Sequence, residues 1–227
     1  MLETYEGVAR NKEEIRKYLE ILNSKKKLPK ENELTYIAKL ILFNKSIFIT
    51  LSNDNKHYNN YMIYNMLMLM HSLTKDSKIN FYQLYRSLIE NILRVMLNLD
   101  DNDETGVNEL FRRFSEKYEN SEKGKEFTYF IKGEYSNACD YVHSNIKADI
   151  DVFLFYSEIL NSDEMDNENV VKLIFIIKTF LFKFTEFIVN VAPTKVEAVY
   201  YRKYSEMKHL IGEKLYLDFK KIINELW

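Results

Sequence analysis

The sequence predicts an all-α fold, a single compact bundle of about eight or nine helices. Apolar residues recur at helical spacing along almost the whole chain. Only five Gly and two Pro occur among the 227 residues. These shares lie far below the usual values of about 7% and 5%, and they leave few positions for the turns of a strand-rich fold. A chain of this length buries roughly 70% or more of its unfolded surface, which is enough for one sizeable core.

Nine segments have a helical period, and the connections between them are short and charged. The segments are 9–26, 33–52, 56–74, 78–99, 104–120, 122–146, 148–161, 167–191 and 195–225, the last with a break near Gly212. Three starts show the spacing of a reciprocal N-cap, in which the capping residue precedes a Glu by three positions. The predicted capping residues are Asn11, Asp101 and Thr194. No linker is long enough to separate domains, so residues 1–227 are predicted to form one domain.

Several segments are apolar enough to be core helices. The predicted core helices are 56–74, 78–99, 122–146 and 167–191. Segment 56–74 is apolar on nearly all sides and is expected at the centre of the bundle. A cavity beside its Met66 and Met70 would suit a small-molecule sensor, although filling of the core is the more common use of such residues. Lys and Glu side chains gather on one face of 167–191, which predicts an amphipathic helix and not a membrane span.

The composition argues against several classes of protein. Cys139 is the only cysteine, so no intramolecular disulfide can form, and no Cys/His spacing resembles a metal site. No glycine-rich phosphate loop or nucleophile motif occurs, so we expect neither a metal nor a cofactor. The formal net charge of −2 gives no global indication of nucleic-acid binding. The acidic N-terminal stretch does not resemble a secretory signal, and a reducing cytoplasm is the expected compartment.

The predicted helix 78–99 carries a charged pair on its polar side. Arg86 and Glu90 are one helical turn apart and lie opposite the apolar stripe. On an open surface such a pair contributes only roughly a few tenths of a kcal/mol. If another helix covers this face, Glu90 can hold the guanidinium of Arg86 as a fixed set of donors for an anion. Coverage therefore decides between a surface ion pair and a functional one.

The predicted helix 122–146 is the candidate cover. Its narrow polar stripe consists of Ser136, Asp140, His143 and Ser144. Tyr135 falls on another side of the helix. His143 can exchange a proton near neutral pH, and Asp140, three residues earlier, can hold its tautomer. The alternative is a structural hydrogen bond between these two side chains.

An Arg-x-x-x-Glu helix followed by a Tyr-rich helix that ends in Tyr-Val-His resembles the helical-bundle proteins of the HEPN superfamily. The likeness covers about residues 55–190, with helical extensions at 1–54 and 193–227. Many HEPN proteins belong to bacterial toxin–antitoxin and antiviral abortive-infection systems. The active members are metal-independent ribonucleases with an Arg, four to six residues and then a His, and two copies of this motif meet across a dimer. In this chain Asn137 stands where that Arg would precede His143.

Segment 195–225 contains a second basic and aromatic group. Arg202 and His209 are separated by six residues, which matches the HEPN spacing and places both on one face of a continuous helix. Tyr201, Arg202 and Lys203 combine an aromatic ring with positive charge, as in proteins that stack bases and bind phosphates of single-stranded RNA. An amphipathic helix with long basic side chains along its apolar face is the alternative. We predict an RNA-binding role for these four residues.

Two functions fit these features. The first is a HEPN-like protein of defence or toxin–antitoxin type, acting on RNA as a homodimeric ribonuclease and partnered by an antitoxin or another defence protein. Its catalytic residues are predicted to be Arg86, Glu90, Asp140 and His143. The second is a non-catalytic helical module that binds a protein or a nucleic acid, in which the charged cluster only fixes helix register. An enclosed cluster favours the module, and an open cleft that reaches His143 favours the enzyme.

Overall fold

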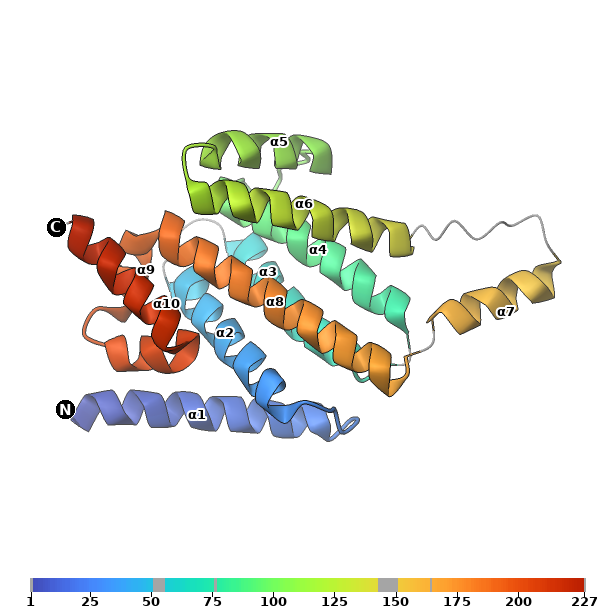
Figure 1. Ribbon diagram of the computed structural model, residues 1–227, viewed down its shortest axis with the longest axis horizontal. Helices are drawn as coiled ribbons and strands as arrows, with labels where there is room; N and C mark the ends of the chain where they lie inside the picture. Colours follow the sequence, from blue (N-terminus) through green and yellow to red (C-terminus); the bar gives the residue numbers. More distant parts are fainter. Residues whose placement is uncertain (1, 51–55, 76, 143–150, 164, 227) are drawn as a thin grey trace.

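The computed structural model describes residues 2–50, 56–75, 77–142, 151–163 and 165–226. The described residues form ten α-helices and no strand, so the all-α class is confirmed and the number of helices exceeds the predicted eight or nine. The helices are α1 (Leu2–Asn23), α2 (Glu31–Thr50), α3 (Lys56–Ser72), α4 (Lys78–Leu97), α5 (Val107–Tyr118), α6 (Glu122–Val142), α7 (Val152–Asp163), α8 (Asn167–Val191), α9 (Pro193–Tyr200) and α10 (Tyr204–Leu226) (Figure 1).

The additional helix arises in the segment predicted as 195–225. A turn separates α9 from α10, and Arg202 in this turn has a left-handed backbone conformation, with φ of 61°. Within α10, the backbone of Gly212 departs from helical geometry, with φ of 85° and ψ of 166°. The predicted break at this glycine is therefore confirmed. Only glycine adopts such angles without strain.

The predicted N-caps are wrong at all three positions. α1 already begins at Leu2, so Asn11 lies inside the helix, and its side-chain amide donates to the buried Glu206 carboxylate on α10 (3.4 Å). Asp101 lies in the turn before α5 and does not begin that helix. α9 begins at Pro193, which places Thr194 in the first turn. Proline suits the first helical position because its φ is already helical and its missing N–H needs no partner there.

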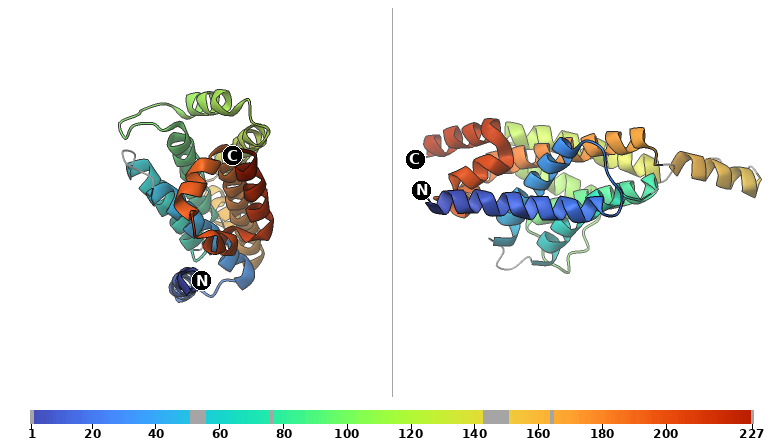
Figure 2. Two further views of the ribbon diagram at one scale, coloured as in Figure 1. Left: turned by 90° about the vertical axis from the view of Figure 1, so that its left-hand side faces the viewer. Right: turned by 90° about the horizontal axis from the view of Figure 1, so that it is seen from below.

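The core lies between α2, α3, α4, α6 and α8 (Figures 1 and 2). The prediction omitted α2, whose Phe43 is fully buried. It also placed the helix that is now α3 too centrally, because one face of α3 meets solvent, with Tyr61 46% and Tyr64 51% exposed. Met66 and Met70 on its other face fill the core and line none of the pockets described below.

α1, α7 and α10 lie outside this core. α1 and α10 pack against each other and against α2 at one side of the bundle. α7 extends away from the rest of the molecule (Figures 1 and 2) and exposes apolar side chains such as Phe153. At its end, the Asp163 carboxylate accepts a hydrogen bond from the backbone N–H of Ile79 in α4 (2.7 Å). None of the helices in the described ranges has both the length and the apolar composition that crossing a bilayer requires.

Candidate functional site

The polar face of α4 is covered by α6. The two helices run side by side (Figure 1), and the hydroxyl of Tyr135 on α6 lies between Arg86 and Glu90 on α4. This hydroxyl donates to Glu90 Oε1 (2.8 Å) and accepts from Arg86 Nη2 (3.3 Å). The guanidinium carbon also lies 5.4 Å from the centre of the Tyr135 ring. The two polar helices therefore meet, through a residue that the helical period had placed on another side of α6.

The Tyr135 hydroxyl remains protonated in this position. Burial raises the pKa of Tyr135 to about 12. Glu90 also raises this pKa, whereas Arg86 lowers it. A protonated hydroxyl donates and accepts at once, so it connects the carboxylate and the guanidinium in a fixed order. The hydrogen bond with Tyr135 is also the main reason that the pKa of Arg86 is raised. All three side chains are half-buried, so the cluster is partly shielded and partly accessible.

Two further aromatic contacts tie α4 to α6. The buried Tyr85 hydroxyl donates to Glu134 Oε2 (2.6 Å), and burial is the main reason that its pKa is well above the usual value. Tyr82 stacks on Tyr141, with ring centres 4.0 Å apart. These contacts, like that of Tyr135, were absent from the sequence-based site. The available signal was the set of tyrosines that recurs on both helices.

The structure does not bring Asp140, another predicted catalytic residue, into this cluster. Asp140 is exposed, and no hydrogen bond or ion pair involving its side chain occurs within the described residues. His143 lies outside the described residues, so its relation to Arg86 stays a prediction. In the part of the chain that the structure describes, no three or more His, Cys, Asp or Glu side chains lie close enough together to bind a metal ion.

A pocket of about 650 Å³ opens between α5 and α6, beside Tyr135. Its lining includes hydroxyl, amide and thiol groups from Asn108, Ser115, Ser136 and Cys139. Two cations border it. Arg112 is ion-paired with Glu109 and Glu116 on its own helix, whereas Lys132 is exposed and has no carboxylate partner among the described residues. The pocket therefore combines neutral hydrogen-bonding groups with the cations Arg112 and Lys132 and the carboxylate of Glu116, so its lining is polar and of mixed charge.

The second predicted group is divided by the turn before α10. Tyr201, Arg202 and Lys203 lie exposed in this turn, with the Arg202 guanidinium 5.3 Å from the centre of the Tyr201 ring. Arg202 and His209 consequently do not share the face of one helix, which corrects the prediction. His209 lies on α10 and borders a groove formed with α1 and α2. Lys203 instead borders a smaller pocket, lined by α1, α2 and Glu206.

The chain matches no known family model, no curated protein and no solved structure. Inference about function therefore has to come from the chemistry of its own residues.

Proposed function

We propose that the protein is a HEPN-like, metal-independent endoribonuclease of the defence or toxin–antitoxin type, acting in the cytoplasm as a homodimer. The observation that carries this proposal is the Arg86 guanidinium, which is hydrogen-bonded to Tyr135; Tyr135 is also bonded to Glu90 and lines the pocket between α5 and α6. A fixed guanidinium stabilises charge that develops on a phosphoryl group, because its donors need no reorganisation during the reaction.

In the proposed reaction the ribose 2′-oxygen attacks the adjacent phosphorus. His143 takes the proton of the 2′-hydroxyl, and Arg86 donates hydrogen bonds to the phosphoryl oxygens as negative charge develops on them. The bond from phosphorus to the 5′-oxygen breaks, and this oxygen takes up the proton that His143 removed from the 2′-hydroxyl. The products are a 2′,3′-cyclic phosphate and a 5′-hydroxyl. Glu90 is a positioning residue that acts on Arg86 through the Tyr135 hydroxyl.

The test is incubation of the purified full chain with single-stranded RNA in the presence of EDTA. We expect cleavage with 2′,3′-cyclic phosphate ends. His143→Ala and Arg86→Lys should each reduce the cleavage rate by at least about 100-fold, which is the order of effect of losing a general acid–base group or a transition-state donor. Matched controls are His57→Ala and Arg10→Lys, since both residues are exposed and lie on helices other than α4, α5 and α6. Intact RNA with the unaltered protein, or equal losses in the controls, would contradict the proposal.

A second candidate function is the non-catalytic module that binds a protein or nucleic-acid partner. The observation in its favour is that Arg86, Tyr135 and Glu90 satisfy one another across the α4–α6 contact. Such a cluster can serve only to fix helix register. In that case Tyr135→Phe lowers stability, and the biological effect of the protein survives the His143→Ala substitution.

A further inference from the structure

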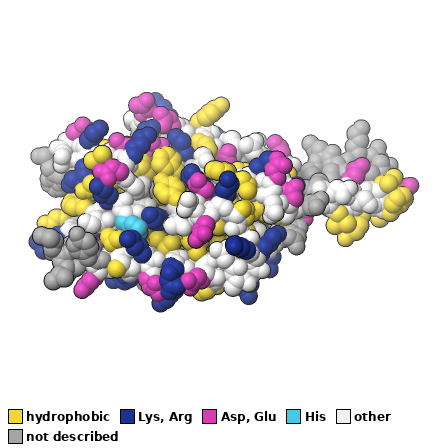
Figure 3. All heavy atoms as spheres, turned by 60° about the horizontal axis from the view of Figure 1, so that its bottom comes forward, with side chains coloured by type: hydrophobic (Ala, Val, Ile, Leu, Met, Phe, Trp, Pro, Cys, Tyr) yellow, Lys and Arg dark blue, Asp and Glu magenta, His cyan; other side chains and the backbone are white. Residues whose placement is uncertain are grey.

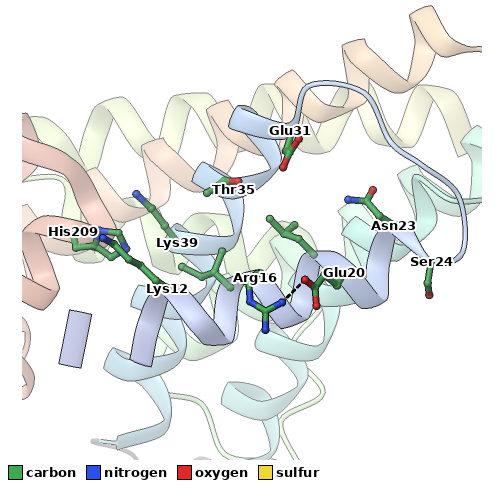
Figure 4. A pocket seen from close by; sticks show the side chains of 11 residues that line it. Lys12, Arg16, Glu20, Asn23, Ser24, Glu31, Thr35, Lys39 and His209 are labelled. Atoms are coloured by element: carbon green, nitrogen blue, oxygen red, sulfur yellow. Dashed lines mark hydrogen bonds and ion pairs between the residues drawn. The ribbon is translucent and has the colours of Figure 1, made fainter. Parts of the chain in front are cut away.

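A groove of about 730 Å³ lies between α1, α2 and α10, on the face that carries α1 (Figures 3 and 4). This volume is within the usual range for small-molecule sites. Residues from the α1–α2 connection border one end, and His209 of α10 borders the other. The groove shares no lining residue with the pocket between α5 and α6. It is therefore separate from the site assigned to RNA cleavage.

Three basic side chains from three helices come together at one end of the groove. Lys12 comes from α1, Lys39 from α2 and His209 from α10 (Figure 4). Burial lowers the pKa of His209, and the charges of both lysines lower it further. The pKa of Lys39 is also lowered, first by burial and then by Lys12. Both lysines therefore lie close enough to disfavour a positive charge on His209, and Lys12 lies close enough to disfavour that of Lys39.

This repulsion is not relieved within the described part of the chain. Neither Lys12 nor Lys39 has a carboxylate within ion-pair distance among the described residues, and the buried Nε2 of His209 has no hydrogen-bond partner there. Nearby basic residues on the same helices differ in this respect. Their ion pairs are Arg16 with Glu13 and Glu20, Lys17 with Glu13, and Lys45 with Glu14. The uncompensated positive charge is thus concentrated inside the groove.

The remainder of the groove contains the Arg16–Glu20 ion pair, one further carboxylate, and apolar and neutral polar groups. Ile15 and Leu19 form a buried apolar floor. Thr35 and Asn23 add neutral hydrogen-bonding groups, and Glu31 places one carboxylate away from the basic end (Figure 4). A ligand that matches this pattern has an anionic group at one end and a partly apolar body that can donate a hydrogen bond. Several donors around one point suit a phosphate, since lysines bind phosphate as point charges.

We propose that this groove binds a small phosphorylated molecule of about nucleotide size, with its phosphate held by Lys12, Lys39 and His209. The phosphate dianion neutralises the two ammonium groups and lies beside the imidazole of His209, whose protonated form it favours. The body of the ligand lies over Ile15 and Leu19. This site is additional to the proposed RNA cleavage and does not depend on it.

Isothermal titration calorimetry of the full chain tests the proposal with three probes. These are inorganic phosphate, adenosine 5′-monophosphate as a representative phosphomonoester, and adenosine, which lacks the phosphate. We expect saturable binding of the monophosphate, weaker binding of inorganic phosphate and none of adenosine. Lys39→Gln and Lys12→Gln should each weaken binding of the monophosphate by about tenfold or more, equal to about 1.4 kcal/mol per tenfold change. The matched control is Lys17→Gln, because Lys17 is ion-paired on the same helix as Lys12 and lies outside the groove.

A thermal melt without ligand separates a binding role from a structural one. Since Lys39 lies among like charges, Lys39→Gln should raise the Tm of the free protein by about 1–3 °C while it weakens phosphate binding. A lysine that stabilises the fold would instead lower the Tm when it is replaced. The proposal is overturned if neither phosphate-bearing probe binds, or if Lys17→Gln weakens binding as much as Lys39→Gln.

Discussion

At the scale of single residues, one hydroxyl group, that of Tyr135, forms both hydrogen bonds of the charged cluster. It is the group through which Arg86 and Glu90 are connected, and it joins α4 to α6. Because the hydroxyl carries both hydrogen bonds, the Phe side chain isolates its contribution while it keeps the ring in its contact with Phe111.

We expect Tyr135→Phe to lower the free energy of unfolding by about 1–2 kcal/mol, since two half-buried charged groups lose a hydrogen-bond partner. Urea denaturation followed by circular dichroism measures this change. The control is Tyr129→Phe, because Tyr129 is 85% exposed and should change stability by less than about 0.5 kcal/mol. Equal stabilities of the two variants would show that the Tyr135 hydrogen bonds contribute nothing measurable.

The sequence could predict part of this cluster. A helical period directly predicts that Arg86 and Glu90 lie one turn apart on the polar side of a helix, because both are local properties of the sequence. Tyr135 was not predicted as a site residue because an aromatic residue on an amphipathic helix usually belongs to the hydrophobic core. The helical period also does not give the position of its hydroxyl group. The position of a side-chain tip depends on the crossing of two helices, which is a tertiary property.

At the scale of helices, Gly212 and Gly133 differ in backbone conformation: Gly212 is non-helical and Gly133 is helical. Gly212 has backbone angles in the region that only glycine occupies readily. Gly133 lies exposed inside the regular helix α6. A Cβ added at either position meets no atom within 4 Å. A comparison of the two positions therefore reports backbone conformation and not steric overlap.

Gly212→Ala should lower the free energy of unfolding by about 1–3 kcal/mol because alanine is strained at the kink of α10. Gly133→Ala should raise it by about 0.5–1 kcal/mol because alanine loses less conformational entropy in a helix. Thermal and urea denaturation of both variants measures the two signs. The same sign for both would mean that the kink at Gly212 is not a constraint on the folded chain.

Helix boundaries were predicted correctly where local sequence determines them and incorrectly where tertiary contacts do. The starts of α3, α4, α6 and α8 were predicted at the residue where each begins, because apolar period and turn residues agree there. The start of α1 was missed because Asn11 resembles a cap in the sequence but is used in a buried contact with α10. The turn between α9 and α10 was missed because Arg202 carries no turn signal of its own.

At the scale of the whole molecule, the basic groove is a feature that the sequence alone does not predict. His209 was selected for its spacing from Arg202, and the structure separates these two residues. Its neighbours in the groove are Lys12 and Lys39, which lie far away in the sequence and on two other helices. Only the packing of α1, α2 and α10 brings the three together. No local pattern could have predicted this site.

The distribution of tyrosines also gives the whole molecule a specific response to alkaline pH. Burial is the main cause of a raised pKa at Tyr18, Tyr36, Tyr82, Tyr85, Tyr118, Tyr135, Tyr200 and Tyr204. A raised pKa means that the folded state keeps the phenol proton at a pH where the unfolded chain has released it. The stabilisation is therefore complete below the unfolded pKa of about 10 and is lost as the pH rises above it.

We expect the free energy of unfolding to be nearly constant from about pH 8 to pH 9.5 and to fall steeply between about pH 10 and pH 12, since each tyrosine that ionises only in the unfolded state contributes about 1.4 kcal/mol per pH unit. Urea denaturation across this range gives the slope. Ultraviolet absorbance of the phenolate distinguishes tyrosine from lysine, which also releases protons here. The phenolate of these eight tyrosines should appear together with the loss of helix, and Tyr85→Phe should make the slope shallower. Complete ionisation of the tyrosines near pH 10 in a chain that stays helical would contradict the burial that links these residues to the fold.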